Sequence, residues 1–301
     1  MIERAIPFTK MSGSGNDFVV IDDRANLLSG VDISGLARAI CSHRISVGAD
    51  GLVVLNDPPL DSSSLAYTWR YINADGSDGE MCGNGAMCAA RFAVRSGIAA
   101  PHHHFLTVSG VVEAWAESAS TEVSIAIADP GRIEAEVLVS VRESNLACTR
   151  IVVGVPHVVI IVDDADLFAD ANAFQAIGQE LRWHDAFAPA GTNVNIVSRI
   201  AHDVWRMRTY ERGVEAETLA CGTGAVAAAI VLGVAGLAPV PMAIRTSGGQ
   251  DLTVCCELDG GQASSVRLSG HAALIYDGVL ADDALSTYDS SQNTRRNSPE
   301  S

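Results

Sequence analysis

One stretch of this chain is apolar on every side of any helix that it could form. The run from Ala225 to Ala238 contains only alanine, valine, isoleucine, leucine and glycine. A helix without a polar face has to be covered by protein all round, so we expect this run to lie inside a curved sheet. The run from Ala86 to Val94 is nearly as apolar. The sequence therefore predicts two buried helices, each enclosed by strands.

Both apolar runs begin with almost the same five residues. Cys82-Gly-Asn-Gly-Ala86 opens the first run and Cys221-Gly-Thr-Gly-Ala225 opens the second. The two copies lie about 140 residues apart, which is the size of one domain. We infer that the chain consists of two halves built on one α/β plan and joined near the turn-like sequence Ala128-Asp-Pro-Gly131.

Strand-like runs outnumber helical ones in the rest of the chain. β-Branched and aromatic residues bounded by turn residues predict the strands, and apolar residues near helical spacing predict two further helices. The expected domains are 1–128 and 129–270, followed by a polar, disordered tail at 282–301. The expected strands are 18–22, 51–55, 67–72, 121–128, 150–153, 158–162, 193–197 and 204–210, and the two further helices are 33–44 and 174–183.

The composition excludes several classes of protein. Hydrophobic residues make up 48% of the 301 residues, which argues against a disordered chain. The formal net charge of −16 argues against nucleic acid or an anionic membrane surface as a partner. The longest apolar stretch is too short to span a bilayer, and no signal peptide precedes the first strand-like residues. The odd number of irregularly spaced cysteines is typical of a reducing compartment, so we expect a cytoplasmic protein.

The two repeated cysteines are the candidate catalytic residues. A cysteine at a helix N-terminus lies beside unpaired N–H groups and the positive end of the helix dipole, which favour the thiolate. The same N–H groups can bind a carboxylate. Two such thiols on opposite sides of a substrate could remove a proton from a carbon and return one to its other face. A single buried cysteine is usually just a small apolar residue, but the duplication makes that reading insufficient for Cys82 and Cys221.

At this point the chain resembles a known family, the diaminopimelate epimerases, over residues from about 8 to 280. The resemblance implies an α/β (α+β) fold with two pseudo-symmetric domains, each a curved, mostly antiparallel sheet wrapped around a central helix. It also implies that a C-terminal strand at 271–281 returns to the first domain. The matching motifs are Lys10-Met-Ser-Gly-Ser-Gly-Asn-Asp-Phe18, Asn73-Ala-Asp-Gly-Ser77, Met81-Cys-Gly-Asn-Gly85, Gly191-Thr-Asn-Val-Asn195, Tyr210-Glu-Arg-Gly213 and Glu217-Thr-Leu-Ala-Cys-Gly-Thr-Gly224.

The resemblance implies epimerisation of LL-2,6-diaminopimelate to the meso form, without pyridoxal phosphate or any other cofactor and without a metal. Such a reaction belongs to lysine and peptidoglycan precursor biosynthesis, and the family habit is a homodimer. Cys221 would accept the proton and Cys82 would donate one, with the roles exchanged in reverse. Glu211 and His157 would tune the thiol pKa values. The implied substrate-binding residues are Asn16, Asn73, Gly83, Asn84, Asn193, Glu211, Arg212, Gly222 and Thr223.

Two departures from the family pattern concern the substrate. Val155 stands where many members have an asparagine before Pro-His, and Gly51 stands where a glutamine often follows Gly-x-Asp. Both affect how the distal end of a substrate is held. A racemase or epimerase of a different amino acid in the same superfamily therefore remains the alternative function. Proline-racemase and phenazine-isomerase relatives are weaker rivals, because Tyr210-Glu-Arg-Gly213 is typical of the epimerase branch.

Two further interpretations come from other classes of protein. A thiol redox protein could use Cys82 and Cys221 as a reversible disulfide, although we expect such a bridge to inactivate an epimerase. The three consecutive histidines at 102–104 could suggest a metal site. We expect them to form an exposed connection instead, because adjacent residues on a strand point to opposite faces.

Overall fold

The computed structural model describes residues 5–62, 64–79, 81–131, 133–141, 144–163, 170–201, 204–281 and 283–284. These residues divide into two compact units. The first unit contains the described residues up to Val123 together with those from His271 onward, and the second spans Ser124–Gly270. The predicted disordered tail at 282–301 lies outside the described residues, apart from Asp283 and Ala284.

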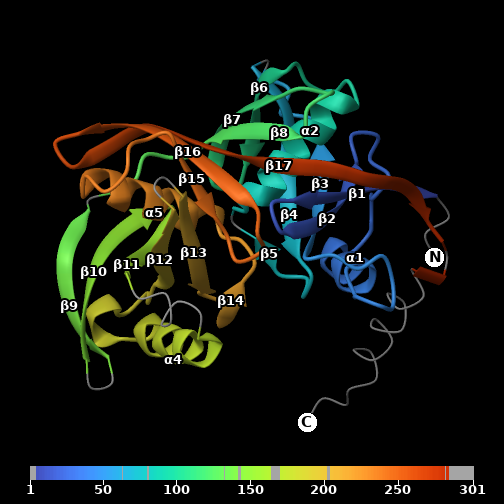
Figure 1. Cartoon of the computed structure of the whole chain (residues 1–301). Helices are drawn as coiled ribbons and strands as arrows, with labels where there is room; N and C mark the ends of the chain where they lie inside the picture. The colour runs from blue at the N-terminus through green and yellow to red at the C-terminus, as the bar shows by residue number, and fades with distance from the viewer. Residues whose placement is uncertain are drawn as a thin grey trace, which may run out of the picture. The chain divides into compact units, whose positions relative to one another are not determined.

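In the first unit, a sheet carries one helix on each face. The long last strand contributes its second part to this sheet, where its residues from Ala272 to Leu280 pair with the first strand. The elements of this unit are β1 (Ile6–Gly13), β2 (Asn16–Asp22), α1 (Ile33–Ile40), β3 (Gly51–Asn56), β4 (Leu65–Asn73), β5 (Asp78–Gly79), α2 (Gly83–Arg95), β6 (His102–Thr107), β7 (Gly110–Ala116) and part of β17 (Gln262–Leu280) (Figure 1).

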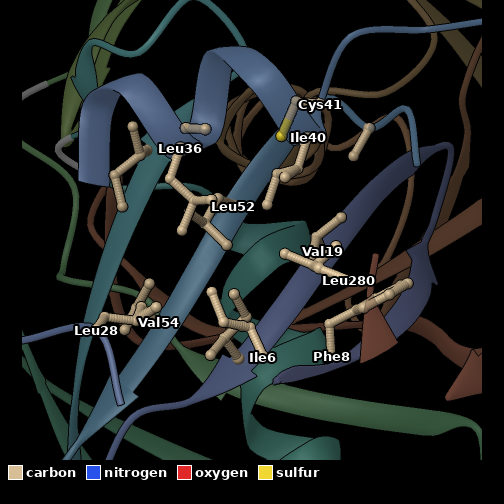
Figure 2. Packing of buried hydrophobic residues seen from close by; sticks show 14 residues of the cluster. Ile6, Phe8, Val19, Leu28, Leu36, Ile40, Cys41, Leu52, Val54 and Leu280 are labelled. Atoms are coloured by element: carbon tan, nitrogen blue, oxygen red, sulfur yellow. The ribbon is translucent and has the colours of Figure 1, made fainter. Parts of the chain in front are cut away.

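Alternation along the strands decides which side chains each helix covers. Val19 of β2 and Leu52 of β3 belong to the apolar cluster beneath α1, where they face Leu36 and Ile40 (Figure 2). Phe18, the residue before Val19 on β2, points to the opposite face of the sheet, toward the first turn of α2. Because successive side chains of a strand alternate between faces, one sheet can bury two helices.

In the second unit, the helix that the apolar run predicts is enclosed by strands. Helix α5 packs against β10 to β13, β15 and β16, and its residues from Gly224 to Leu232 are all buried. The second helix, α4, has its own apolar cluster on the sheet. The elements are β9 (Glu134–Val141), β10 (Ser144–Val153), β11 (Val155–Ile161), α4 (Ala171–Arg182), η1 (Asp185–Phe187), β12 (Asn193–Ala201), β13 (Val204–Glu211), β14 (Ala216–Thr218), α5 (Gly222–Val234), β15 (Met242–Arg245), β16 (Asp251–Asp259) and the first part of β17; β8 (Glu122–Ala126) spans the division between the units.

The order and direction of strand pairing repeat between the units. In the first, β2 pairs parallel with β3, and β4 pairs parallel with β6, with α2 between β5 and β6. In the second, β11 pairs parallel with β12, and β13 pairs parallel with β15, with α5 between β14 and β15. Most other pairings are antiparallel. The predicted fold class, with two pseudo-symmetric halves and mostly antiparallel sheets, is therefore confirmed.

The predicted elements match the observed ones, with three differences. Helix α1 ends at Ile40 and not at 44, with Cys41 as its C-cap residue. Helix α5 ends at Val234 and not at 238, because Gly236 adopts a left-handed conformation (φ 68°) just after the helix. The histidines at 102–104 do not form an exposed connection, so that prediction was wrong. They begin strand β6, where His103 is buried and its Nδ1–H donates to the Ala100 carbonyl oxygen (2.8 Å). No helix in the described part of the chain is both long and apolar enough to be a membrane span.

Candidate active site

Each repeated cysteine caps the N-terminus of its buried helix. Cys82 precedes α2 with φ −134° and ψ 109°, and Cys221 precedes α5 with φ −132° and ψ 110°. The Cys82 Sγ accepts a hydrogen bond of 3.5 Å from the Gly85 N–H, while the Cys221 Sγ lies 3.6 Å from the Thr223 Oγ1. The duplicated sequence thus produces the same local backbone twice, and in the first copy the sulfur accepts from an N–H group of the first helical turn.

In the first unit, a chain of side-chain amides leads away from the Cys82 motif. The Asn84 Nδ2 donates to the Asn16 Oδ1 (2.8 Å), and the Asn16 Nδ2 donates to the Asp50 Oδ2 (2.9 Å). Because a carboxylate only accepts, Asp50 fixes which way the Asn16 amide points. The Asn84 Oδ1 is buried and has no hydrogen-bond partner among the described residues.

The remaining candidate of this unit, Asn73, lies next to the same chain of contacts. It pairs with Gly51 across β3 and β4, and the neighbouring Ala74 N–H donates to the Asp50 carbonyl (3.1 Å). The Asn73 Nδ2 donates to the Ser77 Oγ (3.0 Å). Asp50 thus contacts Asn16 through its side chain and the residue after Asn73 through its backbone carbonyl. Asn73 therefore lies at the same end of the sheet as Asn16.

The structure gives a physical reason for the glycine at position 51. A Cβ built on Gly51 would lie 2.4 Å from the Tyr71 Cε2 and 3.0 Å from its hydroxyl oxygen. A Cβ on Gly79 would lie 2.2 Å from the Tyr71 Cδ1. The ring of Tyr71 thus fills the space that a larger residue at position 51 would need.

In the second unit, Asn195 organises a buried network beside the Cys221 motif. Its Oδ1 accepts from the Thr209 Oγ1 (2.9 Å), and its Nδ2 lies 3.1 Å from the Val158 carbonyl and 3.1 Å from the His157 Nδ1. Since the Asn195 Nδ2 is a donor, the His157 Nδ1 must accept, and a neutral His157 carries its proton on Nε2. That Nε2 is buried without a partner among the described residues.

Asn195 also lies directly below the first turn of α5. A Cβ on Gly224 would be 2.4 Å from the Asn195 Oδ1 and 3.2 Å from the Cys221 Sγ. The third residue after the cysteine must therefore be glycine for the amide to approach the helix. This is a close approach of the kind that only glycine permits.

Burial and charge shift the acid–base properties of two predicted site residues in opposite ways. Complete burial, reinforced by the positive charge of Arg212, lowers the pKa of His157 to about 3, so this imidazole is neutral at pH 7. Burial raises the pKa of Glu211, and the hydrogen bond that its carboxylate accepts from the Thr218 Oγ1 (2.8 Å) partly opposes this. The Asn193 Oδ1 accepts from the Arg212 N–H (2.7 Å), which fixes the loop that carries the guanidinium.

Val155 leaves an apolar side chain at the entrance to β11. It pairs with Val153 across the tight turn at Gly154, and two residues later along the strand lies His157 on the same face. Position 155 therefore offers no side-chain amide to a substrate, unlike the asparagine that many family members have there.

The candidates thus gather around two helix starts, one in each unit. Sequence reasoning gave no role to four residues that hold the candidates in place. Asn195 and Thr218 lie inside the matching motifs and Asp50 lies in the Gly-x-Asp pattern, while Thr209 looks like an ordinary strand residue. The first unit holds Asn16, Asn73, Cys82, Gly83 and Asn84; the second holds His157, Asn193, Glu211, Arg212, Cys221, Gly222 and Thr223; the missed residues are Asp50, Asn195, Thr209 and Thr218.

Solved structures with this fold include racemases, epimerases and phenazine biosynthesis proteins. A hydroxyproline epimerase from Agrobacterium vitis matches with a TM-score of 0.67 and 15% identity, over 93% of this chain and 94% of that one. A probable proline racemase from Agrobacterium radiobacter gives a TM-score of 0.66 and 16% identity, over 92% and 93%. A phenazine biosynthesis protein of Bacillus anthracis gives 0.65 and 12%, over 92% and 99%. The class defined by this fold is that of the two-domain epimerase-like proteins.

Sequence comparison narrows this class to one family. The family model described as diaminopimelate epimerase matches residues 8–130 and 149–272. The diaminopimelate epimerase of Aquifex aeolicus is 39% identical over 92% of this chain and 99% of its own length. That of Hydrogenobaculum is 37% identical over 91% and 98%. The chain belongs to the diaminopimelate epimerase family.

Proposed function

We propose that this protein epimerises LL-2,6-diaminopimelate to meso-diaminopimelate, using Cys82 and Cys221 as its two acid–base groups. The observation that carries the proposal is the pair of cysteine N-caps with the same backbone angles on the two buried helices. Family membership supports the substrate. Lysine and peptidoglycan precursor biosynthesis follows as the metabolic setting.

In the forward direction, the Cys221 thiolate removes the proton from the α-carbon and becomes a thiol. The Cys82 thiol then gives its proton to the opposite face of the carbanion and becomes a thiolate. The N–H groups at the helix starts bind the substrate carboxylate and stabilise the charge that develops on it. In the reverse direction, the two sulfurs exchange roles. This scheme requires the two units to place both sulfurs against one carbon atom when substrate is bound.

The remaining candidates divide into groups that bind and groups that tune. Arg212 can hold a carboxylate through a bidentate fork, and Asn16, Asn73 and Asn193 can accept from an ammonium group or donate to a carboxylate. A neutral His157 with its proton on Nε2 adds a donor without adding a charge.

We further propose a cytoplasmic homodimer that needs no cofactor, with domain boundaries at 128/129 and 270/271 and the strand 271–281 in the first domain. The odd number and irregular spacing of the seven cysteines support the reducing compartment. Homodimers are also the commonest soluble oligomers. Gel filtration with light scattering tests the oligomeric state.

The second candidate is a racemase or epimerase of another amino acid, which the apolar Val155 favours. The two candidates differ in the substrate that acquires label. Purified protein in deuterated solvent should transfer deuterium to the inverted carbon of diaminopimelate, with little label in the substrate recovered early. Label in a different amino acid from a panel, with none in diaminopimelate, would replace the first candidate with the second.

Single cysteine variants test the two-base scheme. Cys82→Ala and Cys221→Ala should each lose epimerisation by about a hundredfold or more, as expected for removal of a general acid or base. Cys255→Ala, which changes a half-buried cysteine of β16, is the matched control and should keep full activity. Full turnover by either of the first two variants would refute the scheme.

A further inference from the structure

The outer face of the β6–β7 hairpin gathers two histidines and a glutamate. His102 and His104 are two residues apart on β6 and therefore point to the same face. Glu113 lies directly opposite His104 in the register of β6 with β7. Its Oε1 is 2.7 Å from the His102 Nε2 and 3.9 Å from the His104 Nε2. Because side chains alternate along a strand, three consecutive histidines cannot all face one metal ion, but the first and third, His102 and His104, can.

These distances fit one metal ion. Tetrahedral zinc with ligands at about 2.1 Å separates neighbouring ligand atoms by about 3.4 Å. The observed separations of 2.7 Å and 3.9 Å lie on either side of this value, so small rotations of exposed side chains suffice. The His102 ring is already held in place by stacking on Trp115, with centroids 5.2 Å apart and planes 5° apart. All three ligand atoms lie within 4.8 Å of one another.

We propose that His102, His104 and Glu113 bind a divalent transition-metal ion such as Zn²⁺. Two imidazoles and one carboxylate are a ligand set that zinc accepts, with water completing the coordination. The site is solvent-exposed and ties β6 to β7. Binding to the folded state alone would raise the melting temperature of the protein.

Zinc titration by calorimetry and melting curves on the full-length protein tests this site. Thiols in general can also bind zinc, and the chain has seven free cysteines, so the site is measured as a difference between variants. His104→Ala and Glu113→Gln should each lose one bound zinc or weaken its affinity at least about tenfold, and should lose the matching rise in melting temperature. His271→Ala, which removes an exposed histidine from β17, should bind as the wild type does. Equal stoichiometry and affinity in wild type and His104→Ala would overturn the proposal.

A second, independent observation concerns Tyr71. Its ring lies between Gly51 and Gly79, both of which lack the side chain that would displace it. It makes edge contact with Phe18 and stacks on Trp69, each with ring centroids 6.0 Å apart. The residue is therefore held in one position.

That position is next to the Cys82 helix. A Cβ on Gly85, in the first turn of α2, would lie 3.3 Å from Trp69 and 3.4 Å from Phe18. Tyr71 is two residues beyond Trp69 on the same face, which is about 7 Å along a strand. Asn73 follows at the next step on that face. If the reacting carbon of a substrate lies at Cys82, a group several bonds away from that carbon would be the one to reach Tyr71.

We infer that Tyr71 is a specificity-determining residue whose hydroxyl contacts the end of the substrate remote from the reacting carbon. This inference rests on the proposed function. A phenol can donate to a carboxylate or accept from an ammonium group, and diaminopimelate carries both at its second end. Tyr71 and Gly51 then act together, because any side chain at position 51 moves the ring.

Steady-state kinetics of Tyr71→Phe test this role. The KM should rise about tenfold or more while kcat changes little, since a hydrogen bond to a charged group is lost at a site that does not react. Tyr67→Phe is the matched control, because Tyr67 lies on the same face of β4 but is fully buried against Phe105. It should keep the wild-type KM.

The outcome separates this inference from the proposed function. If the wild type turns over another amino acid and not diaminopimelate, the proposed function fails, and the KM comparison is made with that amino acid. An unchanged KM in Tyr71→Phe overturns the inference for either substrate. Gly51→Ala should also raise KM, and adding Tyr71→Phe to it should raise KM by less than the product of the two single effects.

Discussion

Adding one methyl group to Gly224 should dismantle the network below the Cys221 helix. The new Cβ would lie 2.4 Å from the Asn195 Oδ1, where ordinary contact needs about 3.4 Å or more, so the amide must move by about 1 Å. This breaks its hydrogen bonds with Thr209, Val158 and His157, each contributing about 1 kcal/mol. The gain in helix propensity from glycine to alanine returns about 1 kcal/mol. We expect Gly224→Ala to lower the free energy of unfolding by about 2 kcal/mol.

The equivalent glycine of the first motif is the control for this prediction. A Cβ on Gly85 would lie 3.3 Å from Trp69 and 3.4 Å from Phe18, which small shifts can relieve. Gly85→Ala should therefore change the free energy of unfolding by less than about 1 kcal/mol. Urea unfolding of both variants, followed by circular dichroism, measures the difference. If Gly224→Ala is as stable as Gly85→Ala, the amide does not lie where we place it and the argument about Asn195 is wrong.

Three further predictions concern the acid–base groups of the second unit. Asn195→Asp places an acceptor against the His157 Nδ1, so His157 should move its proton to Nδ1 and its pKa should rise above 3; ¹⁵N shifts of the ring report both, and an unchanged tautomer would count against the network. Because the pKa of His157 is about 3 when folded and near 6.5 when unfolded, the unfolded state binds more protons between these values. Stability should thus be lost as pH falls below 6.5, by about 2 kcal/mol at pH 5, and His157→Gln should flatten this part of the unfolding free energy against pH. Thr218→Val removes a hydrogen bond that lowers the pKa of Glu211, so the acidic limb of the pH–rate profile should move to higher pH; an unmoved limb would mean that Glu211 does not control it.

The buried helices could be predicted from the sequence because their signal is local. A run without polar residues has only one kind of environment available, and α5 lies in it. The helix starts at Cys82 and Cys221 could also be predicted, because the cysteine and glycine residues that mark them stand directly before each run. The β-branched runs of β2, β3 and β11 were equally clear, since their composition alone indicates buried strands.

Other features depend on contacts between distant residues, which a single sequence does not show. The strand at 102–107 begins with three histidines, whose strand propensity is unremarkable, and only its pairing with β7 and β4 makes it part of the sheet. The role of Asn195 depends on His157, 38 positions earlier in the chain. From the sequence alone, Gly51 only indicates that a glutamine side chain is missing; that the Tyr71 ring occupies this space depends on the pairing of distant strands.

The pairing of β1 with β17 has a consequence for how the chain is made. These strands pair from Ile6 with Leu280 to Gly13 with Ala272, with one register shift between Lys10 and Met11. The paired segments therefore stand at nearly opposite ends of the sequence. The second unit, by contrast, is one uninterrupted segment. On a translating ribosome, which releases the chain from its N-terminus, the first sheet waits with an open edge until the last strand emerges. The half that is synthesised first is therefore the half that is completed last.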